Sequence, residues 1–358
     1  MIIERLSRLR DFLREKKADA VVVNKDVDLC YFSGFRGDDS LLLVSADDAL
    51  LVTDSRYTEQ AAQQAPLFEI VEQKDGLLAR AAELIKAHGW KIIAFEGNAM
   101  VYDRFVKLRD LLGADASLES SVDLGELRTV KDAEEIACIK KAAAIGDEAF
   151  LDIVSFLRPG VSEREAAARL ESTMRSLGSE RPAFTTIVAS GRRGSLPHGV
   201  ATEKLIVSGE FVTMDFGAVY RGYHSDMTRT VCVGRASDTQ RALYRMVLDV
   251  QEFGVSLVVP GASGKAVDAA VRGRLEDAGY GKFFGHGLGH SLGLEIHEEP
   301  RLSKSSTCEH LLPGMIVTVE PGVYLPGKGG LRIEDTVLVT ETGGVPLTLS
   351  SKRLIEIL

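Results

Sequence analysis

Four carboxylates recur at matching positions in two segments of the sequence. Residues 209–217 (GEFVTMDFG) and 314–322 (GMIVTVEPG) share a glycine, a Val-Thr pair, an acid and a second glycine at the same offsets. Each acid is followed, after a stretch of turn residues, by another acid on a second apolar run. The four are Asp215, Asp226, Glu320 and Glu334. This pattern predicts a duplicated unit in which each copy forms a β-hairpin with one acid on each strand.

Carboxylates in apolar strands predict a metal site. A single acid such as Asp215 could instead cap a turn or pair with an arginine, for which Arg221, Arg229 and Arg332 are candidates. Four buried like charges repel, however, and require a shared counter-charge. Two divalent ions about 3.5–4 Å apart would supply it. An oxygen-rich ligand set favours Mn²⁺ or Co²⁺, with Zn²⁺ not excluded.

Histidines suited to such a site lie among glycines in residues 281–297 (GKFFGHGLGHSLGLEIH). They are His286, His290 and His297, and His198 lies upstream in Leu196-Pro-His-Gly. A single histidine of this kind is more often a core residue, but their clustering favours a site. The spacing of the first two is that of HExxH, yet residue 287 is glycine, so a zincin base is missing. The glycines argue against a regular helix here, and no Gly-Lys-Ser/Thr follows that would indicate a phosphate loop.

The elements that must position these residues divide into two parts. The first 125 or so residues alternate short apolar runs with helical periodicity, which predicts an α/β domain. Residues 131–157 then read as a long helix with Asp132 and Glu135 as its capping pair, and residues 162–177 as a second helix. We therefore expect one domain over residues 1–126 and a second over 127–358.

The overall composition restricts the class of protein. The 358 residues are 45% hydrophobic and 27% charged, with a formal net charge of −9, which argues against disorder and against nucleic-acid binding. The first residues lack the apolar core of a signal peptide, and no apolar run is long enough to span a bilayer. The four cysteines are scattered without a CxxC pair, as is typical of a reducing compartment. We expect a cytoplasmic protein that does not act at a membrane.

The ordered motifs resemble the pita-bread metallopeptidases, and among them the aminopeptidase P and prolidase branch. The resemblance covers nearly the whole chain and rests on the motifs MDFG, SDMTRT, GHGLGHSLG, VEPGVY and RIEDT. The stretches YFSGFRGDDSLLLV and LLVTDSRY are similar to the family's N-terminal creatinase-like domain. The implied fold is an α/β (α+β) chain, with a creatinase-like N-terminal domain followed by a duplicated pita-bread catalytic domain.

The resemblance also implies roles for individual residues. Asp215 would bind one metal ion, His290 and Glu320 the other, and Asp226 and Glu334 would bridge the two. A hydroxide bridging the ions would attack the scissile carbonyl, with Glu320 as general base. His198 and His297 would hydrogen-bond the carbonyl oxygen of the substrate or relay protons. His286 would line the pocket that accepts proline. Tyr324 and Arg332 would support the carboxylates that bind metal. The implied cofactor is a pair of divalent ions, with Mn²⁺ expected first.

The expected reaction is hydrolysis of the Xaa-Pro bond at the N-terminus of small peptides with proline in second position. Arg301 resembles an arginine with which some prolidases hold the dipeptide carboxylate, but it could equally pair with Glu298 or Glu299 on the surface. Aminopeptidase P and dipeptidase activities thus both remain open. The alternatives are a methionine-aminopeptidase-like enzyme, although such enzymes usually lack the first domain, and a non-catalytic peptide-binding module, although such homologues typically lose ligands. The family also implies a homodimer.

Overall fold

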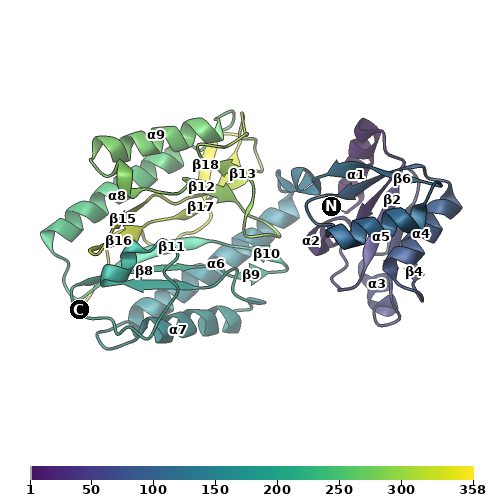
Figure 1. The fold of residues 1–358 in the computed structure, drawn as a ribbon. Helices are drawn as coiled ribbons and strands as arrows, with labels where there is room; N and C mark the ends of the chain where they lie inside the picture. Colours follow the sequence, from purple (N-terminus) through teal and green to yellow (C-terminus); the bar gives the residue numbers. More distant parts are fainter. Residues whose placement is uncertain (1) are drawn as a thin grey trace. The chain divides into compact units, whose positions relative to one another are not determined.

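The computed structural model describes residues 2–358, which fall into two compact units (Figure 1). The first unit ends at Arg128, and the second is Thr129–Leu358. Each unit has its own buried core. Among residues 2–358, no helix combines the length and apolar character needed to cross a membrane.

The first unit is built around a mixed sheet with the strand order β4-β3-β2-β1-β5-β6. Neighbouring strands are parallel except at β2, which is antiparallel to both β1 and β3. The strands are β1 (Ala20–Val23), β2 (Leu41–Ser45), β3 (Ala49–Thr53), β4 (Glu69–Glu72), β5 (Ile92–Glu96) and β6 (Ser117–Val122). The helices are α1 (Ile2–Lys16), α2 (Asp26–Ser33), α3 (Thr58–Gln64), α4 (Leu77–His88) and α5 (Tyr102–Leu112). This confirms the expected α/β pattern.

Most of these helices have an apolar face at helical spacing, but α2 does not. In α4, for example, Ala81, Ala82 and Ile85 form one face that packs on the core. The sequence pattern did not predict α2. Five of its eight residues are buried, Asp28, Leu29, Tyr31, Phe32 and Ser33, and two of them are polar, so they show no apolar helical stripe.

The second unit contains two larger sheets, antiparallel throughout except for the parallel pair β11–β19, and four long helices within residues 129–358. One sheet has the order β19-β11-β8-β7 and the other β13-β12-β14-β17-β18. The helices are α6 (Ala133–Phe156), α7 (Glu163–Ser176), α8 (Asp238–Ser256) and α9 (Gly264–Asp277). The strands are β7 (Ile187–Ser190), β8 (Glu210–Phe216), β9 (Val219–Tyr220), β10 (Tyr223–His224), β11 (Met227–Val233), β12 (Gly289–Ser291), β13 (Glu298–Leu302), β14 (Ile316–Val319), β15 (Gly322–Leu325), β16 (Gly329–Arg332), β17 (Asp335–Thr340), β18 (Gly343–Pro346) and β19 (Glu356–Ile357).

The two predicted helix starts are confirmed in detail. Asp132 accepts hydrogen bonds from the backbone at the start of α6, and Glu135 reaches back to the Asp132 backbone N–H. Ser162 and Glu165 form the same reciprocal pair at the start of α7. Each capping pair satisfies backbone N–H donors that the first helical turn leaves without partners.

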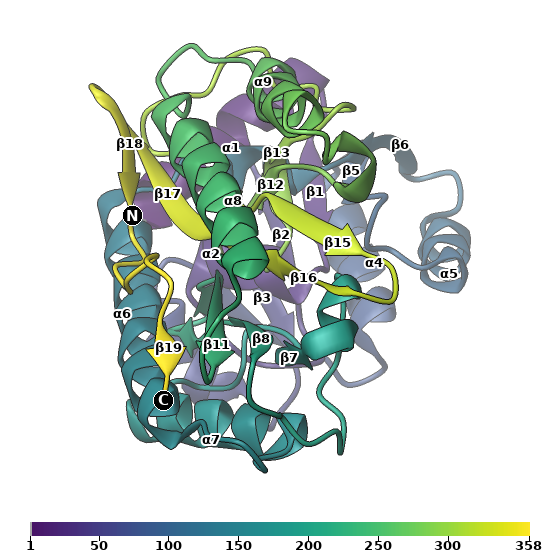
Figure 2. The same cartoon turned by 90° about the vertical axis from the view of Figure 1, so that its left-hand side faces the viewer.

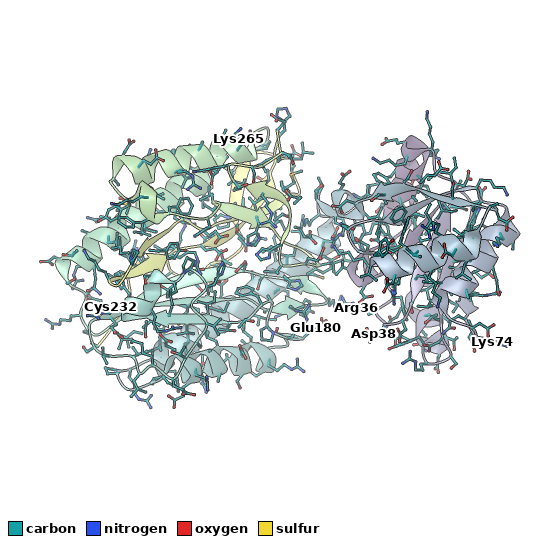
Figure 3. All side chains as sticks on the ribbon, in the orientation of Figure 1. Arg36, Asp38, Lys74, Glu180, Cys232 and Lys265 are labelled. Carbon is teal, nitrogen blue, oxygen red and sulfur yellow. The ribbon has the colours of Figure 1, made fainter. Side chains whose placement is uncertain are left out.

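Each sheet is covered on its outer side by its own pair of helices. Residues of α6 and α7 share a core with β8 and β11, whereas residues of α8 and α9 share another with β14 and β17. In Figure 1 the α8–α9 pair lies above the strands and the α6–α7 pair below them, and Figure 2 shows the same separation after a quarter turn. Figure 3 illustrates the contrast between surface and interior, because Lys265 on α9 is exposed while Cys232 of β11 is buried. The strands therefore face each other between two helical layers.

The predicted hairpins are present, with one difference in detail. β8 pairs with β11 and β14 pairs with β17, both antiparallel. Only Asp215 lies within a strand, while the other three acids adjoin strand ends. The intervening segments form small hairpins of their own, β9–β10 and β15–β16. These extra hairpins arise because the turn-rich stretches also carry residues that can pair, such as Val323 with Leu331.

Candidate metal centre

Alternation along β8 turns Asp215 away from the helices. Val212, Met214 and Phe216 face the α6–α7 core, so the residues between them point to the opposite side of the sheet. Thr228 pairs with Asp215 across the strands. Asp226 lies just before β11 and is therefore at the same end of this hairpin.

The second hairpin presents its acids in the same way. Glu320 follows the last residue of β14 and Glu334 precedes the first residue of β17, whose ends pair as Val319 with Asp335. Glu334 is held from the other half, because the Thr228 hydroxyl donates to its Oε2 at 2.7 Å. The two halves are thus joined by hydrogen bonds at the acids themselves.

His290 lies on β12 with its ring turned toward both hairpins. Its Nδ1 lies 3.0 Å from the Ser291 carbonyl oxygen, which fixes the proton on Nδ1 and leaves the Nε2 lone pair free. Nε2 lies 3.6 Å from Asp226 Oδ2 and 3.6 Å from Glu320 Oε1. Burial, followed by the neighbouring His297, lowers the pKa of His290 to about 3. The ring is therefore neutral and suited to ligate a metal.

The donor atoms converge on a space that suits a cation. One ligand atom each from Asp226, His290 and Glu334 lies within 4.8 Å of the others. Asp215 Oδ1, Asp226 Oδ1 and Glu334 Oε1 are buried and have no hydrogen-bond partner anywhere in residues 2–358. Buried carboxylate oxygens without donors are costly, and a divalent ion would satisfy them.

The electrostatics of the acids point to the same conclusion. Burial, followed by the neighbouring carboxylates, raises the pKa of Asp226 and of Glu334 well above the usual range. Burial raises the pKa of Glu320 to about 8, against the opposing effect of Arg332. The buried carboxylates therefore oppose one another's ionisation, and added positive charge would favour their ionised forms.

Arg332 contacts an acid of the centre directly, and Tyr324 contacts that arginine. Arg332 donates to Asp215 Oδ2 at 2.7 Å, to the Tyr324 hydroxyl at 2.7 Å and to the Thr228 hydroxyl at 2.9 Å. His286 Nε2 lies 2.8 Å from the same tyrosine hydroxyl. One oxygen of Asp215 therefore pairs with an arginine, and its other oxygen remains available to a metal ion.

A cavity of about 650 Å³ opens over these residues. The predicted residues that line it are His198, Asp215, Asp226, His286, His290, His297, Arg301, Glu320, Arg332 and Glu334. Tyr324 stands behind His286 rather than on the cavity wall. The structure thus gathers the predicted set from segments far apart in the sequence.

Arg301 lies on the cavity wall and also contacts an exposed glutamate. It lines the cavity, its side chain is 46% exposed, and its Nε lies 3.4 Å from Glu299 Oε1. Glu298 instead accepts from the buried Lys131 at 3.1 Å, so it is not the partner proposed for Arg301. The contact with Glu299 joins two exposed groups and leaves the guanidinium accessible to a ligand.

Several residues of the site were not predicted. The apolar wall includes Phe184, Ile187 and Ile296, which carry no motif. Thr228 and Thr336 could have been found from the repeat, since each stands two residues after its acid. Thr336 donates to the backbone carbonyl of Asp226 at 2.8 Å, whereas Thr228 donates to the Glu334 carboxylate, so each hydroxyl bonds the acid-bearing residue of the other half.

Comparison with known families agrees with this site. Residues 137–341 match metallopeptidase family M24, and residues 5–130 match the creatinase/prolidase N-terminal domain. The chain belongs to metallopeptidase family M24, with a creatinase-type N-terminal domain followed by a pita-bread domain. This confirms the expected family and fold class.

Individual relatives align over almost their full length. The chain is 44% identical to the uncharacterized peptidase YqhT of Bacillus subtilis, covering 98% of this chain and 99% of that one. Its structure is similar to an Xaa-Pro dipeptidase from Bacillus anthracis (TM-score 0.95, 42% identity, 99% and 100% coverage). It is also similar to an X-Pro aminopeptidase from Thermotoga maritima (TM-score 0.91, 39% identity, 98% and 99% coverage).

Proposed function

We propose that this protein is a metal-dependent exopeptidase that hydrolyses the Xaa-Pro bond at the N-terminus of small peptides. The observation that carries this proposal is the convergence of Asp226, His290 and Glu334 around buried carboxylate oxygens without donors. Membership of a metallopeptidase family and the names of the relatives above support the reaction class.

The proposed cofactor is a pair of divalent ions, with Mn²⁺ as the first choice. Asp215, Asp226, His290, Glu320 and Glu334 would hold them, because these side chains present oxygen and imidazole donors on one cavity wall. When bound, such ions polarise the scissile carbonyl and lower the pKa of a water molecule, which makes it a nucleophile at neutral pH.

The chain's own residues would orient the substrate and move protons. Glu320 is the proposed general base, because its carboxylate lines the cavity beside His290. His198 and His297 line the same cavity and would donate hydrogen bonds to the carbonyl oxygen as charge develops on it. His297 stands edge-on to His290 with 4.5 Å between ring centres, so this donor adjoins the ligand set.

Substrate length is proposed to depend on Arg301. Proline in second position offers no backbone N–H, so recognition must use the shape of the pocket around His286 and the ends of the peptide. The exposed guanidinium of Arg301 on the cavity wall could bind the carboxylate of a dipeptide. On this basis we propose Xaa-Pro dipeptidase activity first and aminopeptidase P activity second.

A side-by-side hydrolysis assay tests the function. The Mn²⁺-reconstituted protein is given an Xaa-Pro dipeptide, an Xaa-Pro-Xaa-Xaa peptide and a Met-Ala peptide, and the products are resolved. Cleavage of the dipeptide alone supports a dipeptidase, and cleavage of the longer peptide before proline supports aminopeptidase P activity. Cleavage of Met-Ala but of neither proline peptide would indicate methionine-aminopeptidase-like specificity. Mn²⁺ binding without cleavage of any peptide would favour a binding module.

The expected assembly and location are part of the same proposal. We propose a cytoplasmic homodimer, which the family resemblance supports. Sedimentation of the full chain at several concentrations measures its mass in solution, and a monomer at all concentrations would contradict the dimer.

A further inference from the structure

A buried arginine lies directly behind the acids of the proposed metal centre. The side chain of Arg229 on β11 is only 1% exposed. One of its guanidinium nitrogens donates to the backbone carbonyl of Glu334 and, at 3.0 Å, to that of Thr228. Thr228 also donates its hydroxyl to the Glu334 carboxylate. Arg229 therefore holds the backbone from which this carboxylate extends.

The position of Arg229 is itself determined by a buried aspartate. Asp335 Oδ1 accepts from Arg229 at 2.8 Å and from the Thr348 hydroxyl at 2.9 Å. Its Oδ2 accepts from Lys352 at 2.8 Å and from Gln251 at 3.0 Å. Four donors from three segments, β11, α8 and the stretch between β18 and β19, fix the orientation of this carboxylate. We refer to Arg229, Gln251, Asp335 and Lys352 as the buried ion cluster.

The buried ion cluster also reaches the acid of the second hairpin. Gln251 Nε2 lies 3.4 Å from the carbonyl oxygen of Val319, the residue before Glu320. Lys352 donates to Gln251 Oε1 at 2.9 Å, which orients the amide of α8. Thus Lys352 contacts no acid of the metal centre, yet it bonds Gln251 directly and is linked to Arg229 through their shared partner Asp335.

Such support matters because the acids repel one another. Asp226 and Glu334 each leave a buried oxygen without a donor in the described part of the chain, and both face other carboxylates. Unless their backbones are held, repulsion would move the carboxylates apart, and metal binding would have to reverse that movement. We propose that the buried ion cluster is a positioning device that sets the affinity of the site for divalent ions. The inference rests on the proposed metal-dependent function.

Removal of the Lys352 charge distinguishes positioning from simple electrostatics. Loss of a nearby positive charge should by itself strengthen the binding of a cation. Loss of a positioning contact should weaken it, by about 10- to 100-fold for groups that orient metal ligands. The two explanations therefore predict opposite signs for Lys352→Met, a substitution that keeps the length of the side chain.

The experiment measures Mn²⁺ affinity of the metal-free full chain by titration calorimetry and its unfolding temperature without metal. The variants are Lys352→Met, the conservative Lys352→Arg and the control Lys204→Met. Lys204 is a good match because its side chain is 28% exposed against 21% for Lys352, and it also bonds a carboxylate, that of Glu210. We expect weaker Mn²⁺ binding for Lys352→Met, recovery in Lys352→Arg and unchanged affinity in Lys204→Met.

Each other result overturns the inference. Unchanged affinity with a lower unfolding temperature would make the cluster merely structural, and tighter binding would make its effect electrostatic. Equal weakening in Lys204→Met would show a general loss of stability. If Lys352→Met does not fold, Gln251→Met is judged by the same criteria. A wild-type protein that binds no Mn²⁺ and cleaves no peptide would instead refute the proposed function.

Discussion

Substitution of Arg301 by alanine tests how the protein measures substrate length. In the free protein the guanidinium makes a 3.4 Å contact with Glu299 between side chains that are 46% and 58% exposed. Such a surface pair contributes about 0–1 kcal/mol, so Arg301→Ala should leave stability almost unchanged. Any large effect must therefore come from the substrate.

The expected effect follows from the bond that Arg301 would make to a carboxylate. A charge-assisted hydrogen bond contributes about 1.5–3 kcal/mol, which corresponds to a loss of about 10- to 150-fold in kcat/KM. Because this guanidinium is partly exposed, we expect the lower end of that range. The loss should fall on dipeptides, whose carboxylate lies beside the proline, and should spare longer peptides.

The assay compares kcat/KM of an Xaa-Pro dipeptide and an Xaa-Pro-Xaa-Xaa peptide in wild type, Arg301→Ala and Arg245→Ala. Arg245 is an exposed arginine of α8 outside the cavity lining, so its loss controls for net charge. An equal loss for both peptides, or no loss for either, would refute the carboxylate-anchor reasoning. An equal loss in Arg245→Ala would assign the effect to general electrostatics.

Three further outcomes are expected. Glu334→Ala should abolish both Mn²⁺ binding in calorimetry and peptide hydrolysis, because it removes one of the three buried metal-ligating groups that converge at the site. Ser162→Ala should lower the unfolding temperature of the second unit by about 2–4 °C, since it deletes the cap of α7, without changing Mn²⁺ affinity. Burial raises the pKa of Glu96 from an ordinary 4.5 to about 8. Between these two pH values the folded protein keeps a proton on Glu96 that the unfolded protein has lost. The free energy of unfolding should therefore fall as the pH rises through this range. Glu96→Gln should remove this loss in urea unfolding followed by the fluorescence of Trp90, the single tryptophan, which packs on the core of the first unit.

Specific results would contradict each of these expectations. Activity or Mn²⁺ binding retained by Glu334→Ala would remove this residue from the ligand set. An unchanged unfolding temperature in Ser162→Ala would mean that other contacts hold the start of α7. A urea midpoint that falls with pH as steeply in Glu96→Gln as in wild type would assign the dependence to another group.

The acids could be predicted because they repeat. Asp215 and Glu320 stand in the same short pattern, and a desolvated carboxylate in an apolar strand requires a physical explanation wherever it occurs. The capping pairs of α6 and α7 were equally accessible, since N-caps are local and their residue types are characteristic.

The buried ion cluster could not be predicted in this way. Arg229 and Asp335 are separated by 106 positions, and Gln251 and Lys352 by 101. Any of several arginines could pair with any acid until the packing of β11 against β17, which belong to different sheets, and the path of the last residues are known. Sequence reasoning considered Arg229 as a partner for an acid of the metal site, whereas in the structure it contacts the backbone of Glu334 and the side chain of Asp335. Long-range partners of this kind depend on tertiary packing that no local pattern encodes.

The separation of the two sheets, each with its own helical layer, has a consequence for how the second unit comes apart. An ion shared by Asp226 and Glu334 would join the halves as a cross-link does, closing a loop of about a hundred residues of chain, and the effect of a cross-link grows with the length of the loop that it closes. With metal bound, neither half could open without releasing the ion, so both should unfold in one transition. Without metal, the α6–α7 half and the α8–α9 half retain separate cores and lose this coupling. Bound metal would thus add to the coupling between the halves that the hydrogen bonds of Thr228 and Arg229 already provide.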